Sequence, residues 1–252
     1  MSKKNSVIYA FNRIEKKYLI SAAQFERITQ RLREYTIADS YGGNDGRYHV
    51  NSLYYDTPDR VMIRRSLEKP YYKEKLRLRS YGTYAPGGTV FAEIKKKVYK
   101  MGNKRRIALS ADTAHEFLTS GFLPREEEHN TSAQITAEIR TLLMRYDLKL
   151  APSVLLSYDR MALIGKDDDA LRISFDKELF AQSGVHTFAD QDLGERLISE
   201  EQVIMEIKTN YSIPLWLASV LSEEKVYPCG FSKYGQAYLN ELAHKKEKLY
   251  VG

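Results

Sequence analysis

The chain has 252 residues, a formal net charge of +6 and a single cysteine. This length supports one domain with a substantial core. A single cysteine excludes an intramolecular disulfide. The basic balance favours an anionic partner but does not choose among phosphate ligands, nucleic acid and lipid headgroups. The N-terminus has no apolar signal core and no segment approaches the roughly 20 apolar residues that span a bilayer, so we expect a soluble, cytoplasmic protein.

The first half of the chain reads as strands with short helices between them. Ser21 is suited to cap a helix in which Phe25, Ile28 and Leu32 recur at helical spacing. The expected elements are a strand at 8–19, the helix after Ser21, a loop at 42–46, a strand at 48–55, a short helix or irregular segment at 59–68, strands at 72–80 and 89–98, a turn at 101–103 and a strand at 104–109.

The second half alternates between helices and strands. An acidic run, Glu126 to Glu128, is expected to be a solvated loop before a longer helix. The expected elements are helices at 112–120 and 131–146, strands at 149–163 and 171–176, a loop-rich section at 177–200, a strand at 202–209, a helix whose first residue is Pro214 and a last helix from about 232 to 246. We therefore expect an α+β fold with many antiparallel strands and helices grouped outside them.

The strands share one pattern, in which charged residues occupy alternate positions. In residues 73–80, cations fall on one parity while Leu76 and Leu78 fall on the other. The polar parity across the strands carries Glu15 and Lys17; Lys73, Lys75, Arg77 and Arg79; Glu93, Lys95 and Lys97; Tyr158 and Arg160; Arg172, Ser174 and Asp176; and Glu206 and Lys208.

Two interpretations of this pattern stay open. In the first, the polar face of an antiparallel sheet meets water. In the second, the strands close into a barrel and the polar parity lines a wet, cationic interior that binds a linear polyanion. Two like charges about 4 Å apart repel by about 1 kcal/mol in water and about 4 kcal/mol at a protein-like dielectric, so the repetition over many strands favours the second interpretation.

Carboxylates within that basic face indicate a divalent metal. Mg²⁺ and Mn²⁺ usually take one or two carboxylates together with substrate phosphate oxygens and waters. Glu206, between Met205 and Ile207, is the best candidate ligand, and an ion pair with a neighbouring cation is the alternative for Glu206 and more so for Glu15 and Glu93. Ser232 and Lys233 begin the last helix, where a helix cap and an anion site are compatible roles.

Other chemistries find little support in the sequence. There is no phosphate-binding loop of the usual nucleotide-binding kind and no nucleophile elbow, and the five histidines show no metal-ligand spacing. Cys229 has no CxxC partner. Tyrosines beside basic residues would suit RNA stacking, but no RNA-recognition motif is visible, so no nucleic acid is expected.

Seven short motifs together resemble the polyphosphate polymerase domain of the VTC (vacuolar transporter chaperone) family, which belongs to the triphosphate tunnel metalloenzymes. The likeness extends in order from residue 8 to residue 240. The motifs are Arg13-x-Glu15-x-Lys17 with Tyr18, Asn51 to Pro58 (NSLYYDTP), Lys75-x-Arg77-x-Arg79, Glu93-x-Lys95, Ser157 to Arg160 (SYDR), Glu206-x-Lys208 and Phe231 to Tyr234 (FSKY).

The resemblance implies a single tunnel domain over residues 1–252, with an ordered core at about 8–244 and a closed antiparallel β-barrel tunnel inside a layer of helices. It also implies transfer of the ATP γ-phosphoryl group to a growing inorganic polyphosphate chain with Mn²⁺ or Mg²⁺. The expected catalytic residues are Lys17, Arg77, Arg79, Arg160 and Lys208. ATP and polyphosphate are expected at Lys75, Lys95, Lys97, Tyr158, Arg172, Ser232 and Lys233, and the metal at Glu206, with Glu15 and Glu93 as weaker candidates.

One motif departs from its relatives. Many tunnel triphosphatases begin with Glu-x-Glu-x-Lys, and Arg13 stands at the first acidic position here, which disfavours metal-dependent hydrolysis as the main activity. Hydrolysis of triphosphate or of a nucleoside triphosphate stays the second hypothesis, and a non-catalytic polyphosphate-binding module the third. Without a membrane segment of its own, the chain would need a separate membrane partner for transport.

Overall fold

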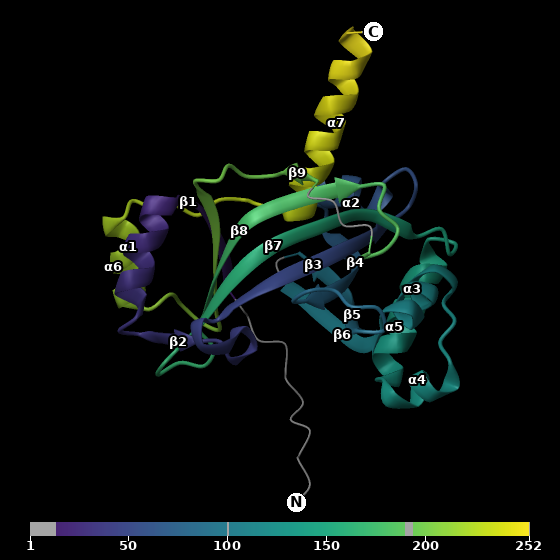
Figure 1. Cartoon of the computed structure of the whole chain (residues 1–252), viewed down its shortest axis with the longest axis horizontal. Helices are drawn as coiled ribbons and strands as arrows, with labels where there is room; N and C mark the ends of the chain where they lie inside the picture. The colour runs from purple at the N-terminus through teal and green to yellow at the C-terminus, as the bar shows by residue number, and fades with distance from the viewer. Residues whose placement is uncertain (1–13, 100, 190–193, 252) are drawn as a thin grey trace, which may run out of the picture.

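The protein has a mixed α+β fold built on one large antiparallel sheet (Figure 1). A computed structural model describes residues 14–99, 101–189 and 194–251. The beginning of the expected first strand, Arg13 and the first six residues of the expected ordered core therefore lie outside the described residues. In the described part of the chain, every helix is too short or too polar to cross a membrane.

The sheet has the hydrogen-bonded order β1-β10-β8-β7-β3-β4-β5-β6, and the short strands β2 and β9 pair with β7 and β8. All of these pairings are antiparallel. The strands are β1 (Ile14–Ser21), β2 (Thr36–Ala38), β3 (Arg47–Asp56), β4 (Tyr72–Tyr81), β5 (Thr89–Val98), β6 (Met101–Ser110), β7 (Ala151–Gly165), β8 (Arg172–Ser183), β9 (Glu195–Arg196) and β10 (Gln202–Thr209).

The helices form three groups around the curled sheet (Figure 1). Helices α1 and α6 lie beside β1, helices α3, α4 and α5 lie together at the opposite side, and α7 projects from the end of the molecule near α2. Their bounds are α1 (Ala22–Leu32), α2 (Val61–Leu67), α3 (Ala111–Ser120), α4 (Arg125–Asn130), α5 (Ala133–Arg145), α6 (Leu215–Glu223) and α7 (Lys233–Val251), with a 3-10 helix η1 (Ser40–Asp45).

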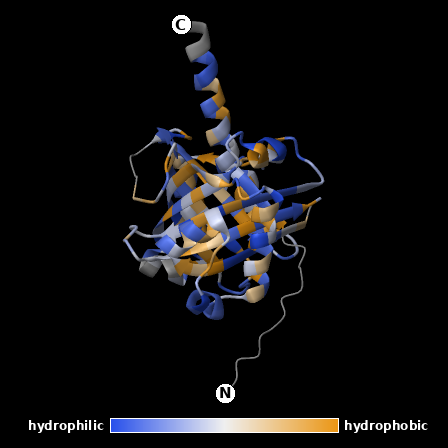
Figure 2. Cartoon of the chain, turned by 90° about the vertical axis from the view of Figure 1, so that its right-hand side faces the viewer, coloured by the Kyte–Doolittle hydropathy of each residue, from blue (hydrophilic) through white to orange (hydrophobic). Residues whose placement is uncertain are grey.

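On β1, β4, β5 and β10 the apolar parity packs outward against these helices. Phe25 and Ile28 of α1 share a buried cluster with Met205 of β10, and Leu76 of β4 shares another with Phe117 of α3. Figure 2 shows the same pattern as hydrophilic and hydrophobic residues that alternate along the strands. Because side chains alternate across a strand, the outward packing turns the charged parity to the opposite side, which we call the inner face.

One end of the inner face is covered by α2 and the beginning of α7. Tyr54 of β3 lies in a buried cluster with Ile63 of α2 and with Tyr234 and Ala237 of α7. Asp56, at the end of β3, accepts hydrogen bonds from the amides of Met62 and Ile63 at 2.9 and 3.0 Å and from the Tyr234 hydroxyl at 2.8 Å. A buried carboxylate thus joins the end of a strand to both helices.

The closed barrel that we expected is not completed by backbone hydrogen bonds. Strands β1 and β6 are the two ends of the sheet, and no pairing between them joins residues that the structure describes. The sheet nevertheless curls far enough for side chains to meet across it, because Glu15 Oε2 on β1 lies 3.7 Å from Lys95 Nζ on β5. Because β5 is the seventh strand in the order that begins with β1, this ion pair joins strands near the two ends of the sheet.

Four local expectations were wrong. Residues 101–103 belong to β6, because pairing with β5 continues to Met101. Glu126–Glu128 lie in the first turn of α4, where carboxylates interact favourably with the helix dipole. Strand β8 continues to Ser183, because the long strand β7 supplies pairing partners for residues 177–183. Pro214 precedes α6 as its cap and is not its first helical residue.

Candidate functional site: the inner face of the sheet

The inner face gathers charged side chains from seven strands. These are Glu15 and Lys17 of β1; Lys73, Lys75, Arg77 and Arg79 of β4; Glu93, Lys95 and Lys97 of β5; Lys104 and Arg106 of β6; Arg160 of β7; Arg172 and Asp176 of β8; and Glu206 and Lys208 of β10. Lys17 interacts electrostatically with Tyr54 of β3, and Lys75 of β4 with Lys17. These strands are distant in the pairing order, so the inner faces converge.

Glu93 is the centre of the first ion-pair group. Arg77 Nε and Nη2 donate to Glu93 Oε2 at 2.8 and 2.7 Å, Arg79 Nε lies 3.9 Å from the same oxygen, and Lys104 Nζ lies 2.5 Å from Oε1. The Glu93 side chain is only 1% exposed. Burial by itself would raise the pKa of Glu93, but Arg77, Arg79 and Lys104 outweigh it and lower the pKa to about 2.

Tyr54 shares Arg77 with that group. Arg77 Nη1 donates to the Tyr54 hydroxyl at 2.8 Å, and the Tyr54 ring stacks on Tyr234 with centroids 4.4 Å apart. Burial opposes ionisation of Tyr54, but Arg77, Lys75 and Arg79 outweigh burial and lower its pKa to about 7. A tyrosine within the basic face is therefore partly ionised near neutral pH.

Asp176 is the centre of the second group. Arg160 holds it in a bidentate pair, Nε to Oδ1 at 2.6 Å and Nη2 to Oδ2 at 2.8 Å, and Lys233 Nζ lies 2.6 Å from Oδ2. The Tyr158 ring faces both cations, and its hydroxyl accepts from Arg79 Nη2 at 3.3 Å. Burial would raise the pKa of Asp176, but Arg160 and Lys233 lower it to about 2.

Glu206 is the centre of the third group. Its carboxylate forms an ion pair with Lys208 and interacts with Lys17, whose ammonium lies 3.6 Å from Glu15. Burial opposes the charge of Glu206, yet Lys208 and Lys17 hold its pKa far below the ordinary value. Burial likewise lowers the pKa of Lys17, and Glu206 and Glu15 outweigh it and raise that pKa.

The beginning of α7 reaches the inner face through Ser232. Its hydroxyl accepts a hydrogen bond from the Gly235 amide at 3.1 Å, as a helix cap does, and a second from Lys75 Nζ at 3.0 Å. Burial lowers the pKa of Lys75 to about 8. The cap and the basic face thus meet at one hydroxyl group.

Other expected residues are more open to solvent. Arg172 Nη1 lies 3.4 Å from Asp39, and the Arg172 side chain is 48% exposed. Lys95 is 49% exposed beside Glu15, and Lys97 is half-buried on the same strand. These three cations are partly exposed, so an incoming anion can reach them from solvent.

Comparisons with known proteins identify the family and the fold of this chain. Residues 12–241 match the family model of the VTC domain. The chain belongs to the VTC domain family. A search among curated proteins found no match.

The VTC domain of this chain is also similar to solved structures. A "putative adenylate cyclase" from Bacillus halodurans matches with a TM-score of 0.53 and 17% identity, over 87% of this chain and 93% of that one. A structure from Hippeastrum, described as a "putative adenylyl cyclase" with a dominant triphosphatase activity, matches with a TM-score of 0.49 and 12% identity, over 90% of this chain and 96% of that one. At these identities the likeness concerns the fold, and only the first is strong enough to support it.

The carboxylates of this VTC domain differ in their fitness for a metal. Across residues 14–99, 101–189 and 194–251, no three His, Cys, Asp or Glu side chains gather as a metal site. Glu93 and Asp176 are surrounded by cations that already take their oxygens. Glu206 and Glu15 lie on the adjacent strands β10 and β1, and in the register of these strands Glu206 is opposite Lys17 and Glu15 is opposite Lys208. Lysines also occupy these two carboxylates, Lys208 at Glu206 and both Lys17 and Lys95 at Glu15, so a divalent ion would have to displace them. Together with substrate phosphates, the two carboxylates would then supply the donor set that Mg²⁺ or Mn²⁺ takes.

Four residues of the inner face were missed as site residues. Lys104 and Arg106 share one parity of β6, opposite to Ile107, and this signal was visible in a segment for which the sequence predicts only a short strand. Asp176 shares the parity of Arg172, and this signal was visible in the sequence. Tyr54 alternates with Leu53 and Tyr55 in an aromatic strand, so nothing in the sequence distinguishes it from a core residue.

Proposed function

We propose that this VTC domain is an ATP-dependent polyphosphate polymerase, and that the curled sheet encloses the channel in which the reaction occurs. The supporting observation is the convergence of cations from seven strands on one inner face, with an ion pair between Glu15 and Lys95 across the sheet. A long face of closely spaced cations suits a linear polyanion, because each phosphate unit meets a separate charge.

The reaction needs no nucleophilic side chain. A terminal oxygen of the polyphosphate chain attacks the γ-phosphorus of ATP, a new P–O bond forms, and the bond from that phosphorus to the bridging oxygen of the β-phosphate breaks. ADP leaves with the electron pair, and the chain is longer by one phosphate. The protein contributes positioning and neutralisation of the charge on the transferred group.

We assign the catalytic role to Lys17, Arg77, Arg79, Arg160 and Lys208. Arg160 holds Asp176 through Nε and Nη2, so its Nη1 is the atom that we assign to a phosphate oxygen. Arg79 holds Ser52 and Tyr158 through Nε and Nη2, and the same assignment applies to its Nη1. These buried partners keep both guanidinium planes in fixed orientations.

The remaining expected residues would bind the length of the substrate. They are Lys75, Lys95, Lys97, Arg172, Ser232 and Lys233, with the Tyr158 ring beneath Arg160 and Lys233. Glu206, with Glu15 beside it, would hold Mn²⁺ or Mg²⁺, and a bound divalent ion would neutralise charge on the phosphate oxygens. The lysines of the inner face would align the triphosphate of ATP with the polyphosphate chain.

The product of an ATP assay tests the proposal. Purified protein with ATP and Mn²⁺ is expected to release ADP and to form a phosphate chain longer than pyrophosphate, resolved on a gel. Free phosphate as the only product would instead identify a triphosphatase, and binding of polyphosphate without turnover would identify a binding module. Arg79→Ala is expected to abolish polymer formation, whereas Arg105→Ala, on the outer parity of β6, is the matched control.

A further inference from the structure

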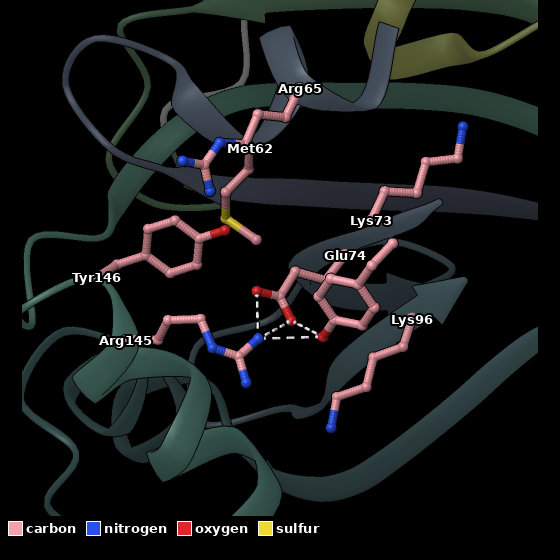
Figure 3. A pocket seen from close by; sticks show the side chains of 8 residues that line it. Met62, Arg65, Lys73, Glu74, Lys96, Arg145 and Tyr146 are labelled. Atoms are coloured by element: carbon pink, nitrogen blue, oxygen red, sulfur yellow. Dashed lines mark hydrogen bonds and ion pairs between the residues drawn. The ribbon is translucent and has the colours of Figure 1, made fainter. Parts of the chain in front are cut away.

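A cavity of about 580 Å³ lies on the outer side of the sheet, between α2, the beginning of β4 and the end of α5 (Figure 3). This size is within the usual range of small-ligand pockets. Its lining consists of Met62 and Arg65 of α2, Tyr72, Lys73 and Glu74 of β4, Lys96 of β5, and Arg145 and Tyr146 at the end of α5. None of the expected site residues is among them.

The floor of this cavity is organised around one buried carboxylate. Arg145 Nη1 donates to both oxygens of Glu74 at 2.9 Å and lies 3.1 Å from the Tyr72 hydroxyl, which itself hydrogen-bonds to Glu74 (Figure 3). Burial raises the pKa of Tyr146 to about 12, with Glu74 acting in the same direction, so the Tyr146 hydroxyl keeps its proton at neutral pH. Because Arg145 and Tyr72 take up its oxygens, Glu74 holds Arg145 in place, and Arg145 offsets the negative charge that would otherwise repel an anionic ligand.

Cations reach the cavity from four separate elements. Arg65 comes from α2, Lys73 from β4, Lys96 from β5 and Arg145 from α5, against Glu74 as the single carboxylate of the lining. Lys96 Nζ also lies 3.0 Å from Glu138, which in turn lies 3.2 Å from Arg105. A lining with this excess of positive charge on several walls matches a ligand that bears several phosphates.

Lys73 connects the cavity to the inner face. It has the parity of Lys75 and pairs in register with Lys97, and its ammonium donates to the Ser66 carbonyl of α2 at 3.2 Å. Burial lowers the pKa of Lys73, and Lys97, Lys69 and Lys95 lower it further. Positive charge is therefore continuous from the inner face, around the beginning of β4, to the cavity.

We propose that this cavity is an outer subsite for the polyphosphate chain, which passes Lys73 at the rim of the inner face and contacts Arg65, Lys96 and Arg145 outside the sheet. This inference rests on the proposed function for the identity of its ligand. A chain long enough to leave the inner face would occupy both places, whereas tripolyphosphate would occupy the inner face alone.

The test compares binding of two sodium salts, tripolyphosphate and a long-chain polyphosphate, by calorimetry at one ionic strength. Arg65→Gln and Lys96→Gln each remove one charge from the cavity, and Arg105 remains beside Glu138 in the second variant. Arg64→Gln is the matched control, because Arg64 is the exposed neighbour of Arg65 on α2 and does not line the cavity.

Each cavity variant is expected to weaken long-chain binding by roughly two- to fivefold and the double variant by on the order of tenfold, with tripolyphosphate binding unchanged. Unchanged long-chain binding in the double variant would overturn the subsite. An equal loss in Arg64→Gln, or an equal loss for tripolyphosphate, would also overturn it. The proposed function is tested by a different measurement: it fails if wild-type protein forms no polymer from ATP. Binding to the subsite is measured without turnover, so the two failures can be told apart.

Discussion

Glu93 and Glu206 are both buried carboxylates on the inner face, but their partners differ in kind. Glu93 is held by two arginines whose side chains are 17% and 7% exposed, Arg77 and Arg79, and by Lys104. Glu206 is held by Lys208 and Lys17, which are 29% and 25% exposed. Arg77 and Arg79 have little access to water, and of these three partners of Glu93 only Lys104 is open to solvent, at 41% exposed. Both partners of Glu206 are ammonium groups that lie near solvent.

This difference separates a structural carboxylate from one that can exchange its partners. A buried charge that loses its partner is costly, so Glu93 and its arginines depend on each other. An ammonium near the surface is rehydrated easily, so Lys208 and Lys17 can leave Glu206 when a more highly charged cation arrives. On this basis Glu206, and not Glu93, is the metal ligand that we propose.

The largest expected effect is on stability. Glu93→Gln leaves Arg77, Arg79 and Lys104 without their shared carboxylate, and we expect a loss of about 3–5 kcal/mol in the free energy of unfolding. Urea denaturation measures this loss. Glu138→Gln, which removes an ion-pair partner of Lys96 and Arg105 on the outer side, is the control and is expected to cost about 1 kcal/mol or less. Equal losses in the two variants would remove the distinction between Glu93 and a surface carboxylate.

The second effect is on turnover. Glu206→Gln keeps the shape of the side chain and removes its charge, so we expect polymer formation to fall by on the order of 100-fold, with a much smaller loss of stability than in Glu93→Gln. Rates measured over a Mn²⁺ titration, together with denaturation curves, check both parts. Wild-type turnover in Glu206→Gln would exclude Glu206 as the metal ligand.

The third effect is a titration of Tyr54, which shares Arg77 with Glu93. The pKa of Tyr54 is lowered from 10.0 to about 7. Its ionisation therefore stabilises the fold fully above about pH 10, and this contribution is lost as the pH falls through about 7. Tyrosinate absorbance in the near ultraviolet is expected to show one tyrosine that ionises near pH 7, and Tyr54→Phe should abolish that step.

Bound tripolyphosphate should raise the pKa of Tyr54, because the phosphates then share the charge of Arg77, Lys75 and Arg79. Retention of the step near pH 7 in Tyr54→Phe would assign it to another residue. A wild-type protein whose first tyrosine ionises only near pH 10 would show that these cations do not act on Tyr54 as the geometry indicates.

The smallest effect is expected at the rim. Arg172 pairs in register with Lys208 and is half exposed, so Arg172→Ala should weaken tripolyphosphate binding by roughly two- to fivefold. Because the contact is solvent-exposed, the difference from wild type should shrink as salt is added. A loss that does not depend on salt would mean that Arg172 contributes through packing.

Much of the sheet follows from local pattern. Lys75, Arg77 and Arg79 alternate with Leu76 and Leu78, and a period of two is enough to place them on opposite faces. The helix after Ser21 was equally predictable, because its cap and its apolar spacing agree and the capping box is present. The end of β8 beyond residue 176, for example Ala181, does not follow from local pattern, because its sequence has a weak strand preference. It becomes a strand because the long neighbour β7 supplies hydrogen-bond partners.

The grouping of the site could not be predicted in the same way. Nothing in a one-dimensional pattern says that Asp176 meets Arg160 and Lys233, or that Tyr54 meets Arg77, which lie 16, 57 and 23 positions apart. Arg160 meets Asp176, and Tyr54 meets Arg77, through the register of neighbouring strands, and Lys233 arrives with the beginning of α7. The curl of the sheet brings Glu15 to Lys95 without the backbone pairing between β1 and β6 that a closed barrel would require in the described chain.

The sequence by itself determined which side of each strand is basic, since alternation is a local property of extended backbone. Only the tertiary structure decided which carboxylate each cation serves, because that choice depends on the distance between strands that are remote in sequence. The kind of partner then distinguishes the two glutamates: two largely buried arginines hold Glu93, whereas partly exposed lysines hold Glu206, the carboxylate that we propose as exchangeable.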